Sequence, residues 1–171
     1  LIYNDVRKFG FVKFFLNKNY LNISHIKKLG PEPLEKQFNY TYFKKNISGR
    51  NRSIKNILMD QKFVSGLGNI YVNEILFASR VKPTRTVVKL NDFEIREIIK
   101  NIKKILKKAI TFGGSTIKDF SSENGKKGVF QQHFKVYDRR GEKCSNIDCN
   151  DTVLRTFISN RSSFFCKNCQ K

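Results

Sequence analysis

Acidic residues are scarce in this 171-residue sequence: 14 Asp and Glu stand against 34 Lys and Arg, a formal net charge of +20 at pH 7. A charge of this size favours polyanionic partners, namely DNA, RNA or an anionic membrane surface. Lys, Asn, Ile and Phe are all abundant, so the codon bias of an AT-rich genome is a second explanation for part of the charge. Long apolar runs are missing as well. No stretch reaches the roughly 18 residues of a membrane-spanning helix, and we expect no membrane span.

Methionine is nearly absent, and no secretory signal is visible. The only methionine is Met59, and the sequence begins with Leu1 rather than with an initiator or a charged-then-apolar leader. We therefore expect an N-terminally truncated piece of a longer cytoplasmic protein. A disordered basic tail is excluded, because 16 Phe and 6 Tyr supply ample core-forming side chains.

The middle of the chain, over about 31–118, has the apolar periodicity of a helical module. Four helices are expected, beginning at about residue 31, after Ser53, at Asn69 and at Asp92, the last of them ending at Gly113 and Gly114.

The two ends of the chain have strand patterns instead. Residues 9–16 are aromatic and β-branched without a helical period, and we expect a strand whose sheet partners were cut away. Short strands are expected at 134–138 and 153–159, in a module of about 134–171. This module is too small to be held together by hydrophobic burial alone, so it needs a staple.

All four cysteines lie in that last module, as Cys144-x4-Cys149 and Cys166-x2-Cys169. Two pairs on tight turns bring four sulfurs within reach of one Zn²⁺ at about 2.3 Å. The alternatives are two disulfides or plain buried thiols, and disulfides fit poorly with a chain that shows no sign of secretion. We expect one structural zinc ion without a catalytic role, because four protein ligands leave no open coordination position.

Several basic residues occur in patterns that favour contacts with phosphates. Arg161 lies between the cysteine pairs, and a zinc hairpin with one arginine at its tip is suited to probe phosphates or a groove. An exposed arginine without function is the alternative. Arg50 and Lys55 belong to a basic run beside a helix start, where backbone amides already favour anions. The lysines of 100–108 repeat along a long helix, and a solvated face is the favoured interpretation for them.

A glycine turn at 66–68 comes directly before Asn69, and its two glycines allow the backbone to approach a phosphate. The turn lacks the third glycine of a dinucleotide fingerprint and the lysine of a P-loop. His25 and His133 are isolated, and the carboxylates form no obvious pair. From the residues alone we predict a zinc-stapled, helical protein that binds duplex nucleic acid, without an identifiable hydrolytic or group-transfer site.

Seven ordered motifs then carry a resemblance that covers essentially the whole chain. They are DVRKFG (5–10), LGPEPL (29–34), IKNILMDQ (54–61), GLGNIY (66–71), GGSTIKDF (113–120), VYDRRGEKC (136–144) and CKNCQK (166–171). This series resembles the bacterial formamidopyrimidine-DNA glycosylase family. The resemblance implies a mainly α fold with little β structure, in three parts. These are the end of an N-terminal β-sandwich domain (1–20), a helix–two-turn–helix domain (21–133) with a lesion-capping loop at 121–128, and a zinc-finger hairpin (134–171).

The resemblance also assigns DNA-binding roles to six residues: Arg7, Phe9, Arg50, Lys55, Asn69 and Arg161. Asn69 matches the asparagine that grips a backbone phosphate, and Lys55 matches a lysine near the lesion pocket. Arg7 matches the residue that faces the orphaned base, and Phe9 the ring that wedges into the stack and offsets part of the cost of flipping a base. Arg161 matches the hairpin arginine that holds phosphates and donates a proton in the final elimination.

The implied function is that of a base-excision repair DNA glycosylase and AP lyase for 8-oxoguanine and formamidopyrimidines in damaged double-stranded DNA. We expect a monomer of the bacterial cytoplasm, associated with the nucleoid. The family's nucleophile is an N-terminal proline amine followed by a glutamate acid/base. Neither occurs in this sequence, so we expect the chain as given to bind DNA without excising a base.

The sequence departs from the family pattern at two points, and two other protein classes remain as alternatives. Besides the missing nucleophile, the first cysteine pair has four intervening residues where the family usually has two, which changes the local shape and not the metal. One rival is an endonuclease VIII-like glycosylase for oxidised pyrimidines, against which the triplet at 7–9 counts. The other is a noncatalytic zinc-ribbon nucleic-acid-binding protein, which leaves the ordered motifs unexplained.

Overall fold

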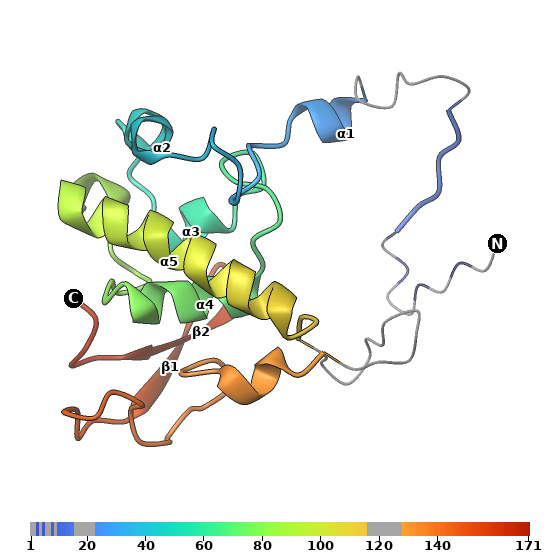
Figure 1. Ribbon diagram of the computed structural model, residues 1–171. Helices are drawn as coiled ribbons and strands as arrows, with labels where there is room; N and C mark the ends of the chain where they lie inside the picture. The colour runs from blue at the N-terminus through green and yellow to red at the C-terminus, as the bar shows by residue number, and fades with distance from the viewer. Residues whose placement is uncertain (1–2, 4, 6–7, 9, 16–22, 116–127) are drawn as a thin grey trace.

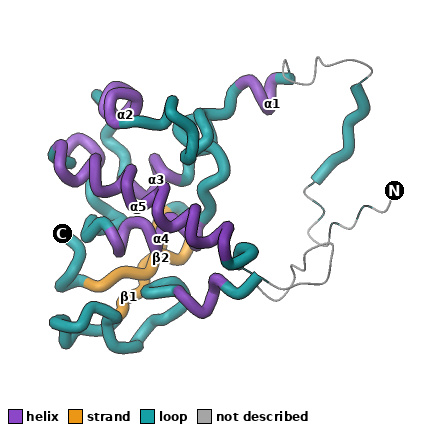
Figure 2. Tube along the Cα trace, viewed as in Figure 1, coloured by secondary structure: helices purple, strands orange, loops and turns teal. Residues whose placement is uncertain are grey.

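The computed structural model describes residues 3, 5, 8, 10–15, 23–115 and 128–171 (Figure 1). The elements are α1 (Ser24–Lys27), α2 (Tyr40–Ile47), α3 (Ile54–Leu58), α4 (Asn69–Ala78) and α5 (Asp92–Thr111), the 3-10 helices η2 (Val87–Lys89) and η3 (Phe130–His133), and the strands β1 (Val153–Ile158) and β2 (Arg161–Cys166). Figure 2 shows that helices and loops dominate and that the strands form one hairpin near the C-terminus. Helix α4 packs against both α5 and β2, so it joins the helical part to the hairpin. None of the described helices is long and apolar enough to cross a bilayer.

The first helix of the predicted module begins later than expected. Residues 31–38 form turns and bends, and α2 begins only at Tyr40. The side chain of Asn39 accepts a hydrogen bond from the amide of Tyr42 at 3.0 Å and so caps the helix at this point. The prediction of a helix from about residue 31 is therefore wrong, although Phe38 in these turns is fully buried in the core.

The next two helices begin where the sequence predicts. The hydroxyl of Ser53 accepts a hydrogen bond from the amide of Asn56 at 3.3 Å and caps α3. After α3 the chain turns through Gly66, whose φ of +79° lies in the left-handed region that favours glycine. Helix α4 then begins at Asn69.

Helix α5 also has the predicted bounds. Asn91 and Glu94 form a capping box at its start, each side chain accepting from the other's backbone amide at 2.9 Å. It ends at Thr111, just before Gly113 and Gly114, whose φ values are +70° and +82°. Its apolar face joins α2, α3 and α4 in the larger core, through Ile95, Ile98 and Ile102.

Strands β1 and β2 pair antiparallel across a two-residue turn, and the prediction of a strand at 153–159 is confirmed except for its last residue, which belongs to the turn. Ile158 pairs with Arg161, and both turn residues, Ser159 and Asn160, have positive φ, as a tight hairpin turn requires. The hairpin has a small apolar cluster of its own, in which Phe77 of α4 takes part.

The stretch 134–138 is not the strand that its pattern predicts. Its backbone donors are used by the carboxylate of Glu74 on α4, which accepts hydrogen bonds from the amides of Lys135, Val136 and Tyr137 at 2.8, 3.0 and 2.8 Å. A segment whose amides are satisfied by a side chain does not need a partner strand. We call this arrangement the Glu74 clasp.

The strand predicted at 9–16 is not found in the described part of that stretch. Residues 10–15 have no regular secondary structure, because no neighbouring strand of the described chain pairs with them. Residues 9 and 16 lie outside the described residues.

Candidate functional site

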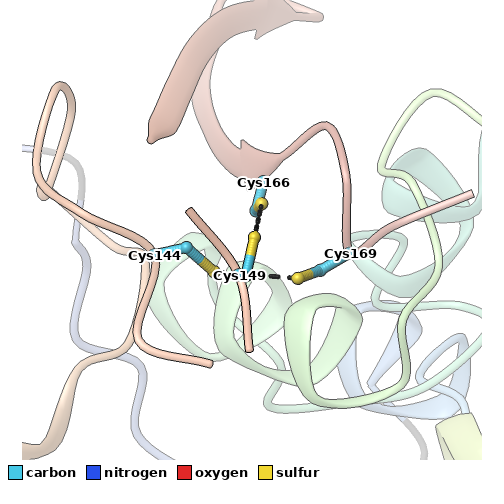
Figure 3. Close-up of side chains that lie close together, drawn as sticks. All are labelled: Cys144, Cys149, Cys166 and Cys169. Atoms are coloured by element: carbon cyan, nitrogen blue, oxygen red, sulfur yellow. Dashed lines mark hydrogen bonds between the residues drawn. The ribbon is translucent and has the colours of Figure 1, made fainter. Parts of the chain in front are cut away.

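The four cysteines of the C-terminal module converge on one point (Figure 3). Their sulfurs all lie within 4.8 Å of one another, and none forms a disulfide. The Sγ atoms of Cys144 and Cys169 are 3.7 Å apart, and those of Cys149 and Cys166 are 3.6 Å apart. Sulfurs at the corners of a tetrahedron around an ion 2.3 Å away are about 3.8 Å apart. The cysteines are thus clustered to bind a metal ion, as their spacing predicts.

The local environment sets the acidities of the thiols in opposite directions. Burial raises the pKa of Cys166 to about 12. The side-chain amide of Asn168, which donates a hydrogen bond to Cys149, lowers the pKa of that thiol to about 7. A bound divalent cation draws such thiols into the thiolate form.

Lys55 is the most deeply placed cation of the described residues, with only 1% of its surface exposed. It projects from α3 into the hairpin, where its Nζ donates hydrogen bonds to the carbonyl of Ser162 at 2.8 Å and to the hydroxyl of Ser163 at 2.6 Å. Burial lowers the pKa of Lys55 to about 8, and the nearby charge of Arg161 acts in the same direction. The side chain of Lys55 therefore supports the hairpin from beneath and does not lie on an open surface.

Asn69, at the first turn of α4, is directed to the same place. Its side-chain amide donates a hydrogen bond to the carbonyl of Ser162 at 3.1 Å. One turn later, the side-chain oxygen of Asn73 accepts a hydrogen bond from the amide of Phe164 at 2.7 Å, and its Nδ2 donates to the carbonyl of Asn69 at 2.6 Å. The beginning of α4 is thereby bonded to strand β2 at two points.

The turn before α4 is held by Gln61. Its side-chain oxygen accepts a hydrogen bond from the amide of Gly66 at 2.8 Å, and its Nε2 donates to the carbonyl of Leu67 at 3.0 Å. The glycine turn is thus held from both sides by one side-chain amide, immediately in front of Asn69.

An open cleft of about 380 Å³ lies between α3 and the hairpin turn. Its polar lining consists of Arg52, Lys55, Asn56, Asp60, Gln61, Ser159 and Arg161. The hairpin turn is fixed over the cleft because the hydroxyl of Ser159 donates to the side-chain oxygen of Asn56 at 3.1 Å. Arg161 is exposed, and within the described residues no acidic side chain pairs with it. Such an arginine beside a basic cleft is free to bind an anion.

The remaining predicted residues are placed less centrally. Arg50 is half-buried and does not line the cleft, but its charge reaches Asp60. Burial opposes ionisation of Asp60, yet the amide of Lys62, the paired guanidinium of Arg52 at 3.0 Å and the charge of Arg50 keep its pKa below the usual value. Lys55 and Arg161 thus line one cleft, with Asn69 next to it and Arg50 outside its lining.

Three predicted features lie outside the described residues. These are Arg7, Phe9 and almost all of the 121–128 loop, and the side chain of His25 is likewise not described. His133 packs its ring on Phe112 at a centroid distance of 4.2 Å, which is the contact of a structural histidine. The lysines of 100–108 follow α5, away from the cleft lining.

Sequence reasoning missed Gln61, Asn73 and Glu74. The last two had a signal, because they are neighbouring polar residues inside the otherwise apolar helix NIYVNEILFA, and both are buried. A buried polar side chain is almost always bonded to something, so this pair indicates a tertiary contact. Gln61 carried no such signal, since its partners are backbone atoms of a turn.

Comparisons with known proteins agree with this arrangement. Residues 29–121, more than half of the chain, match the family model of the formamidopyrimidine-DNA glycosylase H2TH domain. The formamidopyrimidine-DNA glycosylase of Rickettsia canadensis (strain McKiel) is 43% identical over 170 residues, which are 99% of this chain and 61% of that protein. The chain thus spans about three-fifths of the length of the curated relatives it matches.

Solved structures show the same likeness. The MutM (Fpg) protein from Thermus thermophilus superimposes with a TM-score of 0.82 at 34% identity, over 90% of this chain and 57% of that chain. A Lactococcus lactis Fpg mutant in complex with Fapy-dG-containing DNA gives the same TM-score and identity, over 90% of this chain and 55% of that chain. The resemblance drawn from the seven motifs is confirmed, and the chain belongs to the formamidopyrimidine-DNA glycosylase family.

Proposed function

We propose that this chain is the DNA-binding part of a base-excision repair glycosylase and AP lyase that acts on oxidised purines in duplex DNA. The observation that carries the proposal is the convergence of Lys55, Asn69 and the hairpin turn with Arg161 around one basic cleft. A relative in complex with Fapy-dG-containing DNA supports the choice of a purine lesion. The net charge of +20 supplies the long-range attraction that a DNA-binding protein needs.

Within the cleft, the residues have distinct roles. Arg161 binds phosphates next to the lesion and donates a proton in the final elimination. Asn69 contacts a backbone phosphate together with the amides at the start of α4, where the helix dipole favours an anion. Lys55 and Arg50 make the electrostatic potential of the site positive, and Lys55 does so from beneath the hairpin.

Arg7 and Phe9 complete the proposal from the N-terminal side. An arginine that faces the unpaired base and a phenyl ring that enters the stack compensate for the pairing and stacking that a flipped nucleotide gives up. The segment 121–128 closes over the flipped base. We divide the chain accordingly into 1–20, 21–133 and 134–171, and we place the protein as a monomer at the bacterial nucleoid, where its substrate is.

We further propose that the four cysteines hold Zn²⁺. Four thiolates at tetrahedral distances are the donor set that structural zinc prefers, and they leave no position for water or substrate. The ion fixes the two knuckles against each other and so keeps β1 and β2 at the angle that presents Arg161. Its contribution is folding free energy, not chemistry.

The test is the binding of the 171-residue chain to three fluorescent duplexes of one sequence. One contains 8-oxoguanine, one thymine glycol and one no lesion, and anisotropy is measured at two salt concentrations. We expect the tightest binding to the 8-oxoguanine duplex. A preference for thymine glycol would instead indicate an endonuclease VIII-like protein. Equal binding to all three, and to single-stranded DNA, would indicate a nonspecific zinc-ribbon protein.

A further inference from the structure

The metal site contains two asparagines, one inside each cysteine pair. Asn146 lies between Cys144 and Cys149, and Asn168 lies between Cys166 and Cys169. Each side-chain amide reaches across to a sulfur of the other pair. The Nδ2 of Asn146 is 3.0 Å from the Sγ of Cys169, and the Nδ2 of Asn168 is 3.5 Å from the Sγ of Cys149. The two knuckles are therefore linked by a reciprocal pair of N–H···S hydrogen bonds.

The contact made by Asn146 is the shorter of the two and is better protected. Asn146 is half-buried, whereas Asn168 is exposed. The amide of Cys149 donates to the carbonyl of Asn146 at 3.1 Å, which closes a turn inside the first knuckle and leaves the side chain of Asn146 free to reach over.

The sulfur that Asn146 contacts belongs to the most exposed of the four cysteines. Cys169 is partly exposed, whereas the other three cysteines are buried. Four thiolates around one divalent cation carry a net charge of about −2, and each donated hydrogen bond offsets part of that charge. A ligand that is both exposed and highly charged is the one at which a metal ion is lost or a thiolate is oxidised first.

We propose that Asn146 is a positioning residue of the metal centre, which holds the sulfur of Cys169 in place and slows both loss of the metal and oxidation of that cysteine. The proposal rests on the assignment of a metal site to the four cysteines. Asn168 provides the weaker, reciprocal contact. The first knuckle thus delivers a hydrogen-bond donor to the most exposed of the four cysteines.

The experiment compares Asn146→Ala, Asn146→Asp and Asn168→Ala with Asn150→Ala, an exposed asparagine just past the knuckle. Zn²⁺ affinity and release are measured by competition with a chromogenic chelator, and the Co²⁺-substituted proteins are examined by absorption spectroscopy. We expect Asn146→Ala to bind Zn²⁺ about 10- to 100-fold more weakly, the usual effect of losing a hydrogen bond to a metal ligand. Asn146→Asp should be weaker still, because it places a carboxylate against a thiolate. Asn168→Ala should lose less, and Asn150→Ala should behave as the parent chain.

A second readout follows the cysteines themselves. Alkylation by iodoacetamide, located by mass spectrometry in the metal-loaded proteins, should accelerate at Cys169 in both Asn146 variants and not at Cys149. Far-UV circular dichroism, which reports the helix content of the whole chain, establishes that the variants are folded. Unchanged Zn²⁺ release together with unchanged alkylation of Cys169 in both Asn146 variants overturns the inference. Failure of the parent chain to bind Zn²⁺ or Co²⁺ overturns the metal centre itself, and the inference with it.

Discussion

Lys55 and Asn69 donate hydrogen bonds to the same acceptor, the carbonyl oxygen of Ser162, at 2.8 and 3.1 Å. The two donors come from different helices, α3 and α4, and the acceptor is the residue that follows Arg161. The arginine is therefore oriented by two helices at once, through the backbone of its neighbour. This arrangement and the cysteine cluster of the same module lead to four predictions.

The hydroxyl of Ser163 is expected to contribute more to the free energy of unfolding than the hydroxyl of Ser162. It is fully buried and is the second acceptor for Lys55, so Ser163→Ala leaves a buried ammonium with one partner fewer. Removing such a partner costs about 1–3 kcal/mol. Ser162→Ala is the matched control, because Ser162 meets the lysine through its carbonyl. Urea unfolding of both variants makes the comparison, and equal loss in the two would contradict the assigned role of the hydroxyl.

The buried lysine also predicts a pH dependence. Its pKa is about 8 in the folded chain and 10.5 in an ordinary lysine, so the unfolded chain binds this proton more tightly. The free energy of unfolding should therefore rise between about pH 8 and pH 10.5, as the folded protein escapes the cost of a buried charge. Below about pH 8 the cost is fully present and constant. Lys55→Met should lack this rise. The measurement is chemical denaturation of both proteins across that pH range, and the readout is the difference between their free energies of unfolding.

Arg161 is expected to carry one phosphate contact. Arg161→Ala should weaken binding to duplex DNA and reduce the slope of log K against log[salt] by about one. Arg155→Ala is the control, because it removes the same charge from the other strand of the hairpin, where the guanidinium lies over the ring of Phe157 at 4.7 Å. If both variants lower the slope equally, the contact is a general effect of charge rather than a site.

Metal removal should disorder the hairpin before it disturbs the helices. The hairpin cluster is small and includes three of the four cysteines, whereas the helical core is larger and contains none of them. We expect chelation to abolish hydrogen-exchange protection of the amide of Phe164, while amides of α5 stay protected, and to eliminate lesion binding. Protection that persists at Phe164 after metal analysis shows an empty site would refute the structural role of the ion.

Local signals in the sequence located those elements that have local causes. The cap at Ser53, the helix start at Asp92, the glycines that end that helix and the cysteine spacing each depend on a few neighbouring residues, and each expectation is confirmed. The errors have distant causes. The segment 134–138 looks like a strand, but its amides are occupied by Glu74, which lies some sixty residues earlier in the chain.

The candidate functional site shows the same difference between features with local causes and features with distant causes. Arg161 could be predicted as the tip of a hairpin, because the cysteine pairs on either side of it are visible in the sequence. That Lys55 is buried beneath this hairpin could not be predicted, since its partners Ser162 and Ser163 are more than a hundred residues away. A lysine in a basic run is usually exposed, and this one is an exception because strand β2, which packs on α4, provides the acceptors that cover it.

The Glu74 clasp makes unequal demands on the two segments that it joins. The three amides that bind the carboxylate come from the backbone, and every residue except proline supplies one. The clasp itself therefore excludes only proline at 135–137, and the further demands on Val136 and Tyr137 come from their packing in the hairpin cluster. Position 74 has no such freedom, because a helix that arrives without this carboxylate leaves three inward-facing amides without an acceptor.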